Sequence, residues 1–429
     1  MTRTQSRILR AVVAAIVLVP LAATGVAAGE PGAPYRVKDI NSSGSSDPTE
    51  LTAMGGKLYF SAKGGGKGRE LWFSDGTAPG TQRILDIRPG PAGSDPLSLV
   101  PIGNKLFFTA DDGAVGRELW VTDGTAGGTL RLTDENLGPC CGFPNGLTAV
   151  DGALLFFVHA NDNARLELWK SNGTPSGTVR IKRFAGGIHV GTGPESPPTA
   201  FAHRAYFHLS HCAFNVCEGR GLWVSNGTAT GTKHFFSAPG ANTAAPIAAA
   251  SSRLYWNDGS RLLRTNGTAA SSKIMTDVQA TQLAPVGDNL FFHGQTFDAD
   301  PADDGLWVSL GTAATTTLLA ELDSVTELTP LGGLLLFVSG THLMVSDGTP
   351  GGTHVLSTDS NLGTLSNIAG TLYFLMDGAL WATDGSIGGG YKVFDNVQGG
   401  PMTEVNGTGY FVSAGNGQMG GNELWRFVP

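Results

Sequence analysis

The chain has 429 residues, carries a formal net charge of −8 and contains 62 glycines. Its acidic balance argues against nucleic acid and anionic membrane surfaces as partners. Glycine usage is about twice the average of ~7%, and the glycines recur at fixed places in a repeated pattern. The excess therefore indicates turns in an ordered repeat rather than a disordered chain.

The first 28 residues differ from the rest in composition. Three arginines precede an apolar run from residue 11 to residue 28, and the small residues before Gly29 fit a cleavage site. This pattern predicts a secretory signal peptide over residues 1–28, with an uncleaved membrane anchor as the alternative. Its removal leaves 25 of the 28 Lys and Arg against 36 Asp and Glu, a net charge of −11. No later apolar segment is long enough to span a bilayer, so we expect a secreted protein, extracellular, periplasmic or at the cell envelope.

The first unit after this segment has the composition of four short strands. Aromatic and branched residues fill the expected strands, and Gly, Asp, Asn and Pro separate them, as is typical of strands and tight turns. The second and third strands are apolar at successive positions, which suits strands that are buried on both faces. The four expected strands cover residues 51–54, 57–60, 71–74 and 82–87.

This unit recurs along the whole chain. The tryptophan of the third strand, or its replacement, returns at spacings of 37 to 54 residues. A period in the low forties is that of a propeller blade of four strands. The nine positions are Trp72, Trp120, Trp169, Trp223, Leu263, Trp307, Met344, Trp381 and Trp425. The sequence therefore predicts an all-β protein in which residues 29–429 form a single β-propeller of about nine four-stranded repeats.

The two ends of the chain complement each other. The last unit stops after its third strand, at residues 423–429, while Arg36–Ile40 resembles the fourth strand Arg83–Ile87 with no unit before it. Joining the N-terminal strand to the last blade would close the ring and remove an open sheet edge.

The repeated residues have a structural explanation. Asp-Gly and Asn-Gly favour tight turns, because Gly accepts a positive φ and the Asp or Asn oxygen accepts a local backbone hydrogen bond. Asp and Asn interchange at this position, as in Asp75 and Asn172, which suits a turn better than a catalytic or metal-binding charge. The following Thr is expected to bond within the loop, and the tryptophan to fill space between neighbouring blades.

Two units carry the full signature of Glu-Leu-Trp followed by Asp-Gly-Thr, at residues 70–77 and 118–125. By this motif the chain resembles the secreted bacterial proteins that carry the ELWxxDGT repeat, over essentially the whole mature chain. Units five, six and eight depart from the pattern; Leu310 replaces the Asp in unit six, and Ser386 replaces the Thr in unit eight. The family is defined by its repeat, so the resemblance implies no activity, catalytic residue or cofactor.

The loops of such a blade fall on two faces. The turns between strands one and two and between three and four are short and repetitive, whereas the two–three and inter-blade loops vary. Variable loops on a rigid scaffold are where binding usually resides. We therefore expect this face to bind a protein or a surface glycan.

Acidic residues gather in some of these variable loops. Oxygen ligands suit calcium, which takes six to eight of them, so calcium is a possible cofactor, and a solvated acidic loop is the alternative. The candidate ligand-binding residues are Asp111, Asp112, Asp298, Asp300, Asp303 and Asp304, with Asp298, Asp300 and Asp303 as the calcium candidates.

All four cysteines also lie in variable loops. Export to an oxidising compartment favours disulfides, and a bridge between Cys212 and Cys217 within one loop is favoured over a zinc site with His208 and His211. The adjacent Cys140 and Cys141 either bridge each other or pair with the other two, and the sequence leaves all three connectivities open.

The competing hypothesis is a hydrolase or lyase with its site at the central channel. The expected innermost strands offer few charged side chains for catalysis, apart from Glu50, Glu327 and Glu404 near the channel mouth. The chain has no nucleophile elbow, metalloprotease helix or phosphate loop. A non-catalytic binding module is therefore preferred over an enzyme, and a purely structural or adhesive envelope protein is a third hypothesis.

Overall fold

The computed structural model describes residues 32–133, 143–159, 166–184, 197–209, 221–237, 246–258, 260–296, 303–322, 324–357, 362–395, 397, 400–414 and 421–429. Within these ranges the chain forms nine separate four-stranded antiparallel sheets. The predicted all-β propeller and its nine blades are thereby confirmed.

The strands follow one another blade by blade along the chain. The first three blades contain β2 (Thr49–Met54), β3 (Lys57–Lys63), β4 (Arg69–Ser74), β5 (Gln82–Arg83); β6 (Leu97–Ile102), β7 (Lys105–Asp111), β8 (Arg117–Thr122), β9 (Leu130–Arg131); and β10 (Asn145–Val150), β11 (Ala153–His159), β12 (Leu166–Ser171), β13 (Val179–Arg183). The next three contain β14 (Thr199–Phe201), β15 (Arg204–Leu209), β16 (Gly221–Ser225), β17 (Lys233–Ser237); β18 (Ile247–Ala249), β19 (Leu254–Asn257), β20 (Leu262–Thr265), β21 (Lys273–Thr276); and β22 (Val278–Val286), β23 (Asn289–Thr296), β24 (Gly305–Ser309), β25 (Thr316–Glu321). The last three contain β26 (Thr326–Leu331), β27 (Leu334–Ser339), β28 (His342–Ser346), β29 (His354–Ser357); β30 (Ser366–Ile368), β31 (Thr371–Met376), β32 (Ala379–Thr383), β33 (Tyr391–Phe394); and β34 (Thr403–Val405), β35 (Thr408–Ser413), β36 (Glu423–Val428), β1 (Gly32–Lys38). Two short 3₁₀ turns, η1 (Ala269–Ser271) and η3 (Ala313–Thr315), occupy the three–four turns of blades 5 and 6.

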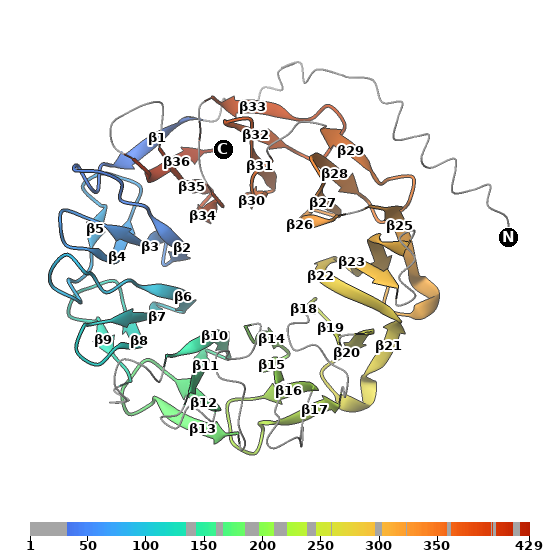
Figure 1. Ribbon diagram of the computed structural model, residues 1–429, viewed down its shortest axis with the longest axis horizontal. Coiled ribbons are helices and arrows are strands. Elements are labelled where there is room, and N and C mark those ends of the chain that lie inside the picture. The colour runs from blue at the N-terminus through green and yellow to red at the C-terminus, as the bar shows by residue number, and fades with distance from the viewer. Residues whose placement is uncertain are drawn as a thin grey trace.

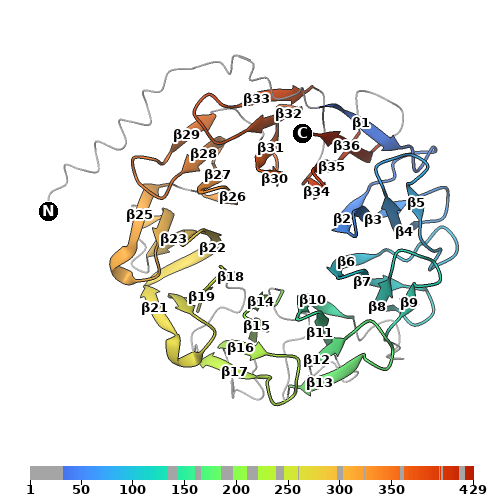
Figure 2. The same ribbon diagram turned by 180° about the vertical axis from the view of Figure 1, so that it is seen from behind.

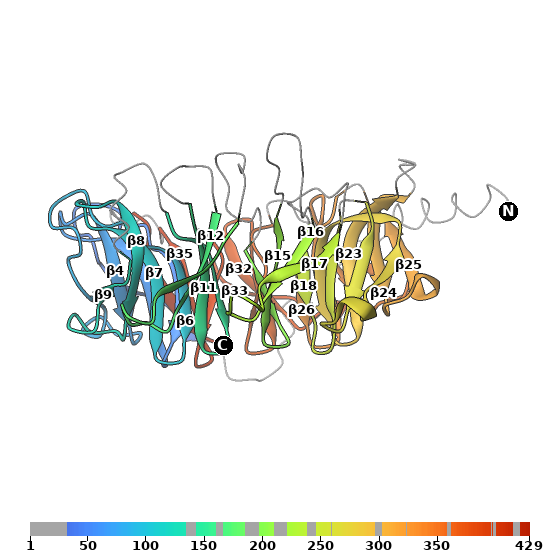
Figure 3. The same ribbon diagram turned by 90° about the horizontal axis from the view of Figure 1, so that it is seen from below.

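The blades form a closed ring around an open centre. In Figure 1 the first strand of every blade lies innermost and the colour runs once around the ring, and Figure 2 shows the same order from behind. First strands of successive blades contact each other, including β34 of the last blade and β2 of the first. Edge-on, the ring is a flat disc whose strands run between its two faces (Figure 3).

The closure joins the two ends of the described chain. β1 pairs antiparallel with β36, with Arg36 opposite Trp425, as the sequence predicts. The strand starts at Gly32 rather than at Arg36. A hydrogen bond from the Ile40 amide to the Glu423 carboxylate, at 3.2 Å, also links the ends. The last blade therefore owes its fourth strand to a segment about 390 residues away along the chain.

Packing between blades explains the doubly apolar strands. Five successive residues of β3, from Leu58 to Ala62, are buried, because one face of the sheet packs on the previous blade and the other on the next. Trp120 belongs to a buried cluster that includes Met54 and Leu71 of the preceding blade, and its indole N–H donates to the Ala110 carbonyl at 3.2 Å. The tryptophan thus fills space between blades, as expected, and also ties the third strand to the second.

The fourth strand of blade 1 is shorter than the sequence predicts. The expected strand at residues 82–87 pairs as β5 only over Gln82–Arg83, followed by one further hydrogen bond from the Ile84 amide to the Leu71 carbonyl at 3.0 Å. The Glu70 carboxylate then accepts the amides of Ile87 and Arg88. Hydrogen bonds to the Glu70 side chain therefore replace strand pairing at the point where the chain leaves this sheet toward the next blade.

The Asp-Gly-Thr turn has the chemistry that the sequence predicts. The Asp75 Oδ1 atom accepts hydrogen bonds from the Thr77 amide and hydroxyl, at 2.9 and 2.7 Å, and the hydroxyl accepts the Gly80 amide. Asn172 makes the same contacts to Thr174 with its own Oδ1. Only the oxygen that both side chains share is used, which explains why Asp and Asn interchange.

Candidate functional site

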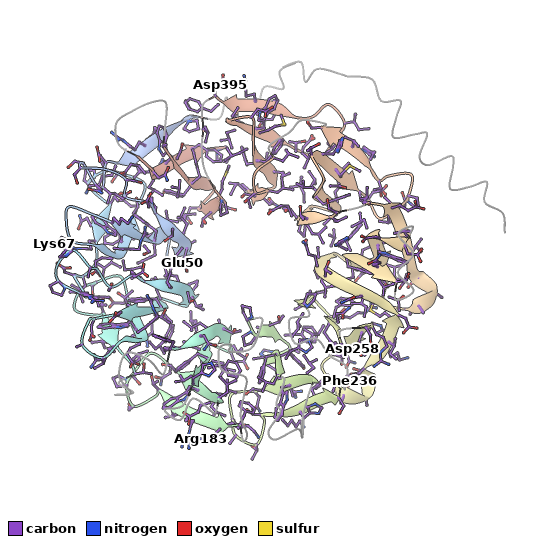
Figure 4. The ribbon with its side chains drawn as sticks, in the orientation of Figure 1. Glu50, Lys67, Arg183, Phe236, Asp258 and Asp395 are labelled. Carbon is purple, nitrogen blue, oxygen red and sulfur yellow. The ribbon has the colours of Figure 1, made fainter. Side chains whose placement is uncertain are left out.

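The three channel-mouth glutamates cross-link the innermost strands. Glu50 of blade 1 accepts the Leu99 amide of blade 2 at 3.3 Å, and its place on the inner rim is labelled in Figure 4. Glu327 of blade 7 accepts the Leu365 amide at 3.4 Å, just before the first strand of blade 8. Each carboxylate thus bonds backbone of a neighbouring blade.

Glu404 completes this set from the last blade. It accepts the Ala369 amide of blade 8 at 3.3 Å and the Gly407 amide of its own hairpin at 3.2 Å. The three acids lie on blades 1, 7 and 9. No group of three or more His, Cys, Asp or Glu side chains with metal-binding geometry occurs among the described residues, so these acids do not form such a cluster.

A β-bulge aims two of these side chains. Glu50 and Glu327 adopt positive φ values of 59° and 55°, and the register of their strands shifts at this point, between Thr49 and Thr52 in blade 1. A bulge re-aims the side chain that it carries. The first strand of blade 2 has the same bulge, with Ser98 at a φ of 56°, so the bulge belongs to the blade, and in blades 1 and 7 it carries the glutamate that bonds the next blade.

A polar groove lies on the variable-loop face between blades 1 and 2. Its volume is about 400 Å³, within the ~300–1,000 Å³ range of ligand pockets. It is bounded by the β3–β4 loop, the loop that joins the two blades, and the β7–β8 loop. The lining residues are Lys63, Gly68, Arg69, Arg88, Pro91, Ala92, Gly93, Asp95, Asp111 and Arg117.

Two glycines let the walls of this groove meet. A Cβ atom on Gly68 would lie 2.3 Å from the Gly93 nitrogen, and one on Gly93 would lie 2.2 Å from the Arg69 nitrogen. The Arg69 carbonyl accepts the Ser94 and Asp95 amides at 2.9 and 3.1 Å. The floor of the groove is therefore backbone, held by hydrogen bonds, and only glycine permits so close an approach.

Ion pairs fix the charged side chains of the groove. Arg88 contacts Asp111 at 2.8 Å, and Arg117 contacts Asp95 at 3.3 Å. Arg69 lies 3.8 Å from the same Asp95 carboxylate. Four cations face two carboxylates along the lining, and Asp47, just outside it, pairs with Lys63 at 3.0 Å. The groove therefore carries a local charge of +1 in an acidic chain.

The structure places Asp111 in this groove and Asp112 beside it. Asp111 accepts the Gly113 amide at 2.7 Å, and Asp112 accepts the Ala114 amide at 2.9 Å and pairs with Arg131. Burial raises the pKa of Asp112, but the backbone hydrogen bonds and Arg131 outweigh it, so that the pKa lies below its usual value. Both carboxylates are satisfied by protein groups, which does not favour them as calcium ligands.

The second acidic loop is only partly within the described residues. Thr296 donates to Asp303 at 2.8 Å, and His293 lies 3.0 Å from Asp304. Asp298 and Asp300 lie outside the described residues, so the calcium hypothesis at Asp298, Asp300 and Asp303 stays a prediction.

All four cysteines lie outside the described residues: Cys140, Cys141, Cys212 and Cys217. Their pairing stays a prediction too. His208, from the zinc alternative, is described and is buried in β15, close to the Gly221 backbone. Its burial lowers the pKa to about 4.

The glutamate of the Glu-Leu-Trp motif has a structural role that the sequence did not predict. Glu70 is fully buried and accepts the amides of Ile87, Arg88 and Ser94 at 3.3, 3.2 and 3.0 Å, and the Ser94 hydroxyl at 2.5 Å. Burial raises the pKa of Glu70 above its usual value, although these hydrogen bonds offset part of the increase. The recurrence of Glu before Leu-Trp was the signal that could have revealed this role.

Other blades use the same glutamate with different partners. Glu423 accepts the Ser46 amide and hydroxyl, at 3.2 and 2.7 Å. Glu167 instead pairs with Arg180 and Arg183, at 2.9 and 2.5 Å. Arg183 is labelled on the outer side of the ring in Figure 4. In blades 1 and 9 the buried carboxylate thus anchors the chain that follows its own blade, and in blade 1 that chain is a wall of the groove, whereas Glu167 pairs with the fourth strand of its own blade.

The fold is similar to that of several solved structures, at low identity. BamB from Moraxella catarrhalis matches at 12% identity and a TM-score of 0.44, over 78% of this chain and 94% of that chain. A puromycin-hydrolyzing peptidase of Mycobacterium tuberculosis matches at 10% identity and 0.42, over 90% and 61%. The GH74 xyloglucanase from Xanthomonas campestris matches at 13% identity and 0.32, over 87% and 72%. At these TM-scores the likeness carries no argument about function.

No protein-family model matches the sequence, and no curated protein matches it either. Among the described residues there is no helix of the length and apolar character needed to cross a membrane.

Proposed function

We propose that the protein is a secreted, non-catalytic β-propeller that binds a protein or glycan at the cell envelope through its variable-loop face. The observation that supports this proposal is the charged groove between blades 1 and 2, which is open on that face and built from three loops. The predicted signal peptide and the resemblance to secreted ELWxxDGT repeat proteins agree with an exported binding module.

The construction of the groove suits binding by a preformed site. Arg69 and Arg117 each donate to a carbonyl of the preceding strand, Ser61 at 2.9 Å and Thr109 at 3.2 Å, so their guanidinium groups are held in place before any ligand arrives. A site whose side chains are already positioned loses less conformational entropy on binding. The rigid ring supplies the support and the loops supply the contacts.

The channel gives less support to the enzyme hypothesis. A hydrolase or lyase there would need an acid or base that can reach a substrate and exchange a proton with it. Glu327 and Glu404 each accept an amide of a neighbouring blade, and Glu50 does the same. These hydrogen bonds give all three glutamates a structural role in joining blades.

Retention on envelope material from the producing organism tests the proposal. We would compare residues 29–429 with a groove variant, Lys63→Gln with Arg88→Gln, and with a matched variant, Lys273→Gln with Lys392→Gln, which removes two charges elsewhere. We expect the wild type and the matched variant to be retained and the groove variant to be lost. The absence of retention, or equal retention of all three proteins, would refute binding through this groove.

A further inference from the structure

The groove between blades 1 and 2 has unused hydrogen-bond donors. The Arg88 guanidinium uses one terminal nitrogen for Asp111 at 2.8 Å, and its Nε and second terminal nitrogen donate to no described residue. Arg69 uses its Nη1 atom for Thr49 and Ser61, and its Nη2 atom likewise donates to no described residue. Guanidinium forks match carboxylates and phosphates in shape and charge, so these donors suit an oxyanion.

The charge of the groove points the same way. Its lining has four cations against two carboxylates, and the excess is still positive when Asp47, the partner of Lys63 at 3.0 Å, is included, whereas the chain as a whole is acidic. Arg88 is 36% exposed at its side chain and Lys63 is 51% exposed, so both can contact a ligand. A local excess of positive charge raises the concentration of anionic ligands at the groove.

The lining offers little to an apolar ligand. Among the described lining residues, only Pro91 and Ala92 have apolar side chains. Protein interfaces take much of their energy from aromatic and aliphatic anchors in pockets, and the described lining provides no such pocket. A hydrophilic ligand that carries negative charge therefore fits better than a hydrophobic peptide.

We infer that this groove binds the carboxylate groups of an acidic polysaccharide. Oxyanions of the sugar acids would meet Arg88 and Arg69, with Lys63 at the open side, and the hydroxyl groups would meet the backbone floor at Gly68 and Gly93. This inference rests on the proposed function, since it names the chemical class of ligand that the variable-loop face would take.

The test is titration of residues 29–429 with trigalacturonate at low ionic strength. Its methyl ester is the uncharged probe of the same shape, and inorganic phosphate and an oligoglutamate peptide are the other anions. We expect trigalacturonate to bind, the ester to bind at least 10-fold more weakly, and binding to be lost in roughly 1 M salt, where the screening length is about 3 Å. Equal binding of the ester, or tighter binding of phosphate or oligoglutamate, would overturn the inference.

Two variants of one ion pair have opposite expected effects. Arg88→Gln should weaken trigalacturonate binding roughly 10-fold, because it removes a charged fork. Asp111→Asn should strengthen it roughly fivefold, because it removes a nearby negative charge and keeps the oxygen that accepts the Gly113 amide. Lys392→Gln, at the outer rim beside Asp395, should change nothing. An unchanged affinity in Arg88→Gln, with an unchanged melting temperature, would overturn the assignment.

The two proposals can fail separately. Groove-dependent retention on envelope material without trigalacturonate binding would refute the acidic sugar and leave the binding function standing. Trigalacturonate binding without any envelope retention would support the groove chemistry and refute the proposed place of action.

Discussion

Replacing Glu70 by alanine should destabilise the ring by about 2–3 kcal/mol. The substitution leaves the Ile87 amide without its acceptor in a buried region, and a buried, unpaired donor costs about 1–3 kcal/mol. The Ser94 amide keeps its hydrogen bond to the Arg69 carbonyl at 2.9 Å. The half-exposed Arg88 amide can bond water, and the Ser94 hydroxyl can rotate, so these two cost less. Relief of the buried charge offsets part of the loss.

A conservative variant separates the charge from the volume. Glu70→Gln keeps the size of the side chain and one oxygen, but it turns an NH₂ group toward donors. We expect a loss of about 1 kcal/mol, smaller than for alanine. Glu321→Ala, at an exposed position of β25, is the matched control and should stay within about 0.5 kcal/mol of the wild type.

Urea unfolding monitored by tryptophan fluorescence measures these differences, provided that the slope against urea stays constant among variants. A Ser94→Ala variant and the double variant complete a mutant cycle. The two changes should be clearly non-additive, because both remove the same short contact. A loss below about 1 kcal/mol for Glu70→Ala, or strict additivity in the cycle, would refute the view that this carboxylate holds the inter-blade loop.

Three further predictions concern other parts of the ring. His208 has a pKa of about 4 in the folded state against 6.5 as its ordinary value, so the unfolded chain takes up a proton first as the pH falls. His208→Leu should therefore remove about 2–3 kcal/mol of the stability that the wild type loses between pH 7.5 and 4.5. Asp75→Asn should be neutral, as Asn172 implies, whereas Asp75→Ala should cost about 1 kcal/mol by removing the turn acceptor. Deleting Gly32–Lys38 should expose the edge of β36 and cause aggregation measurable by light scattering.

Each of these predictions has a result that would contradict it. For His208, the decisive value is the difference between wild type and variant at the two pH values, in which other titrating groups cancel. A constant difference would show that the histidine does not titrate as stated. Equal melting temperatures for both Asp75 variants would show that the side-chain oxygen in the turn does not stabilise the protein. A soluble, monomeric protein without β1 would show that ring closure does not protect β36.

Much of the fold was predictable because its signals are local and periodic. The period of the Trp72 motif predicts four short strands per unit, and the partial units at both ends predict closure between β1 and β36. The turn at Asp75 follows from contacts within six residues. Such features depend on chain neighbours, so a repeated sequence specifies them again in each blade.

The tertiary structure decided which distant groups meet. Glu70 contacts amides 17 to 24 residues away, and Glu50 reaches an amide 49 residues away in the next blade. The groove draws Arg69 from the start of β4, Arg88 from the inter-blade loop and Arg117 from the start of β8. Nothing in the spacing of these residues gives their distances, because those depend on how adjacent blades pack and where the intervening loops turn.

The sequence by itself therefore determined the nine-bladed closed ring and the chemistry of its turns. The pairing of Asp111 with Arg88, and the role of the channel glutamates as links between blades, appear only when neighbouring blades are in place. The physical reason is that periodic hydrophobic and turn residues act through their nearest neighbours, whereas charges on variable loops acquire partners only after the ring has packed.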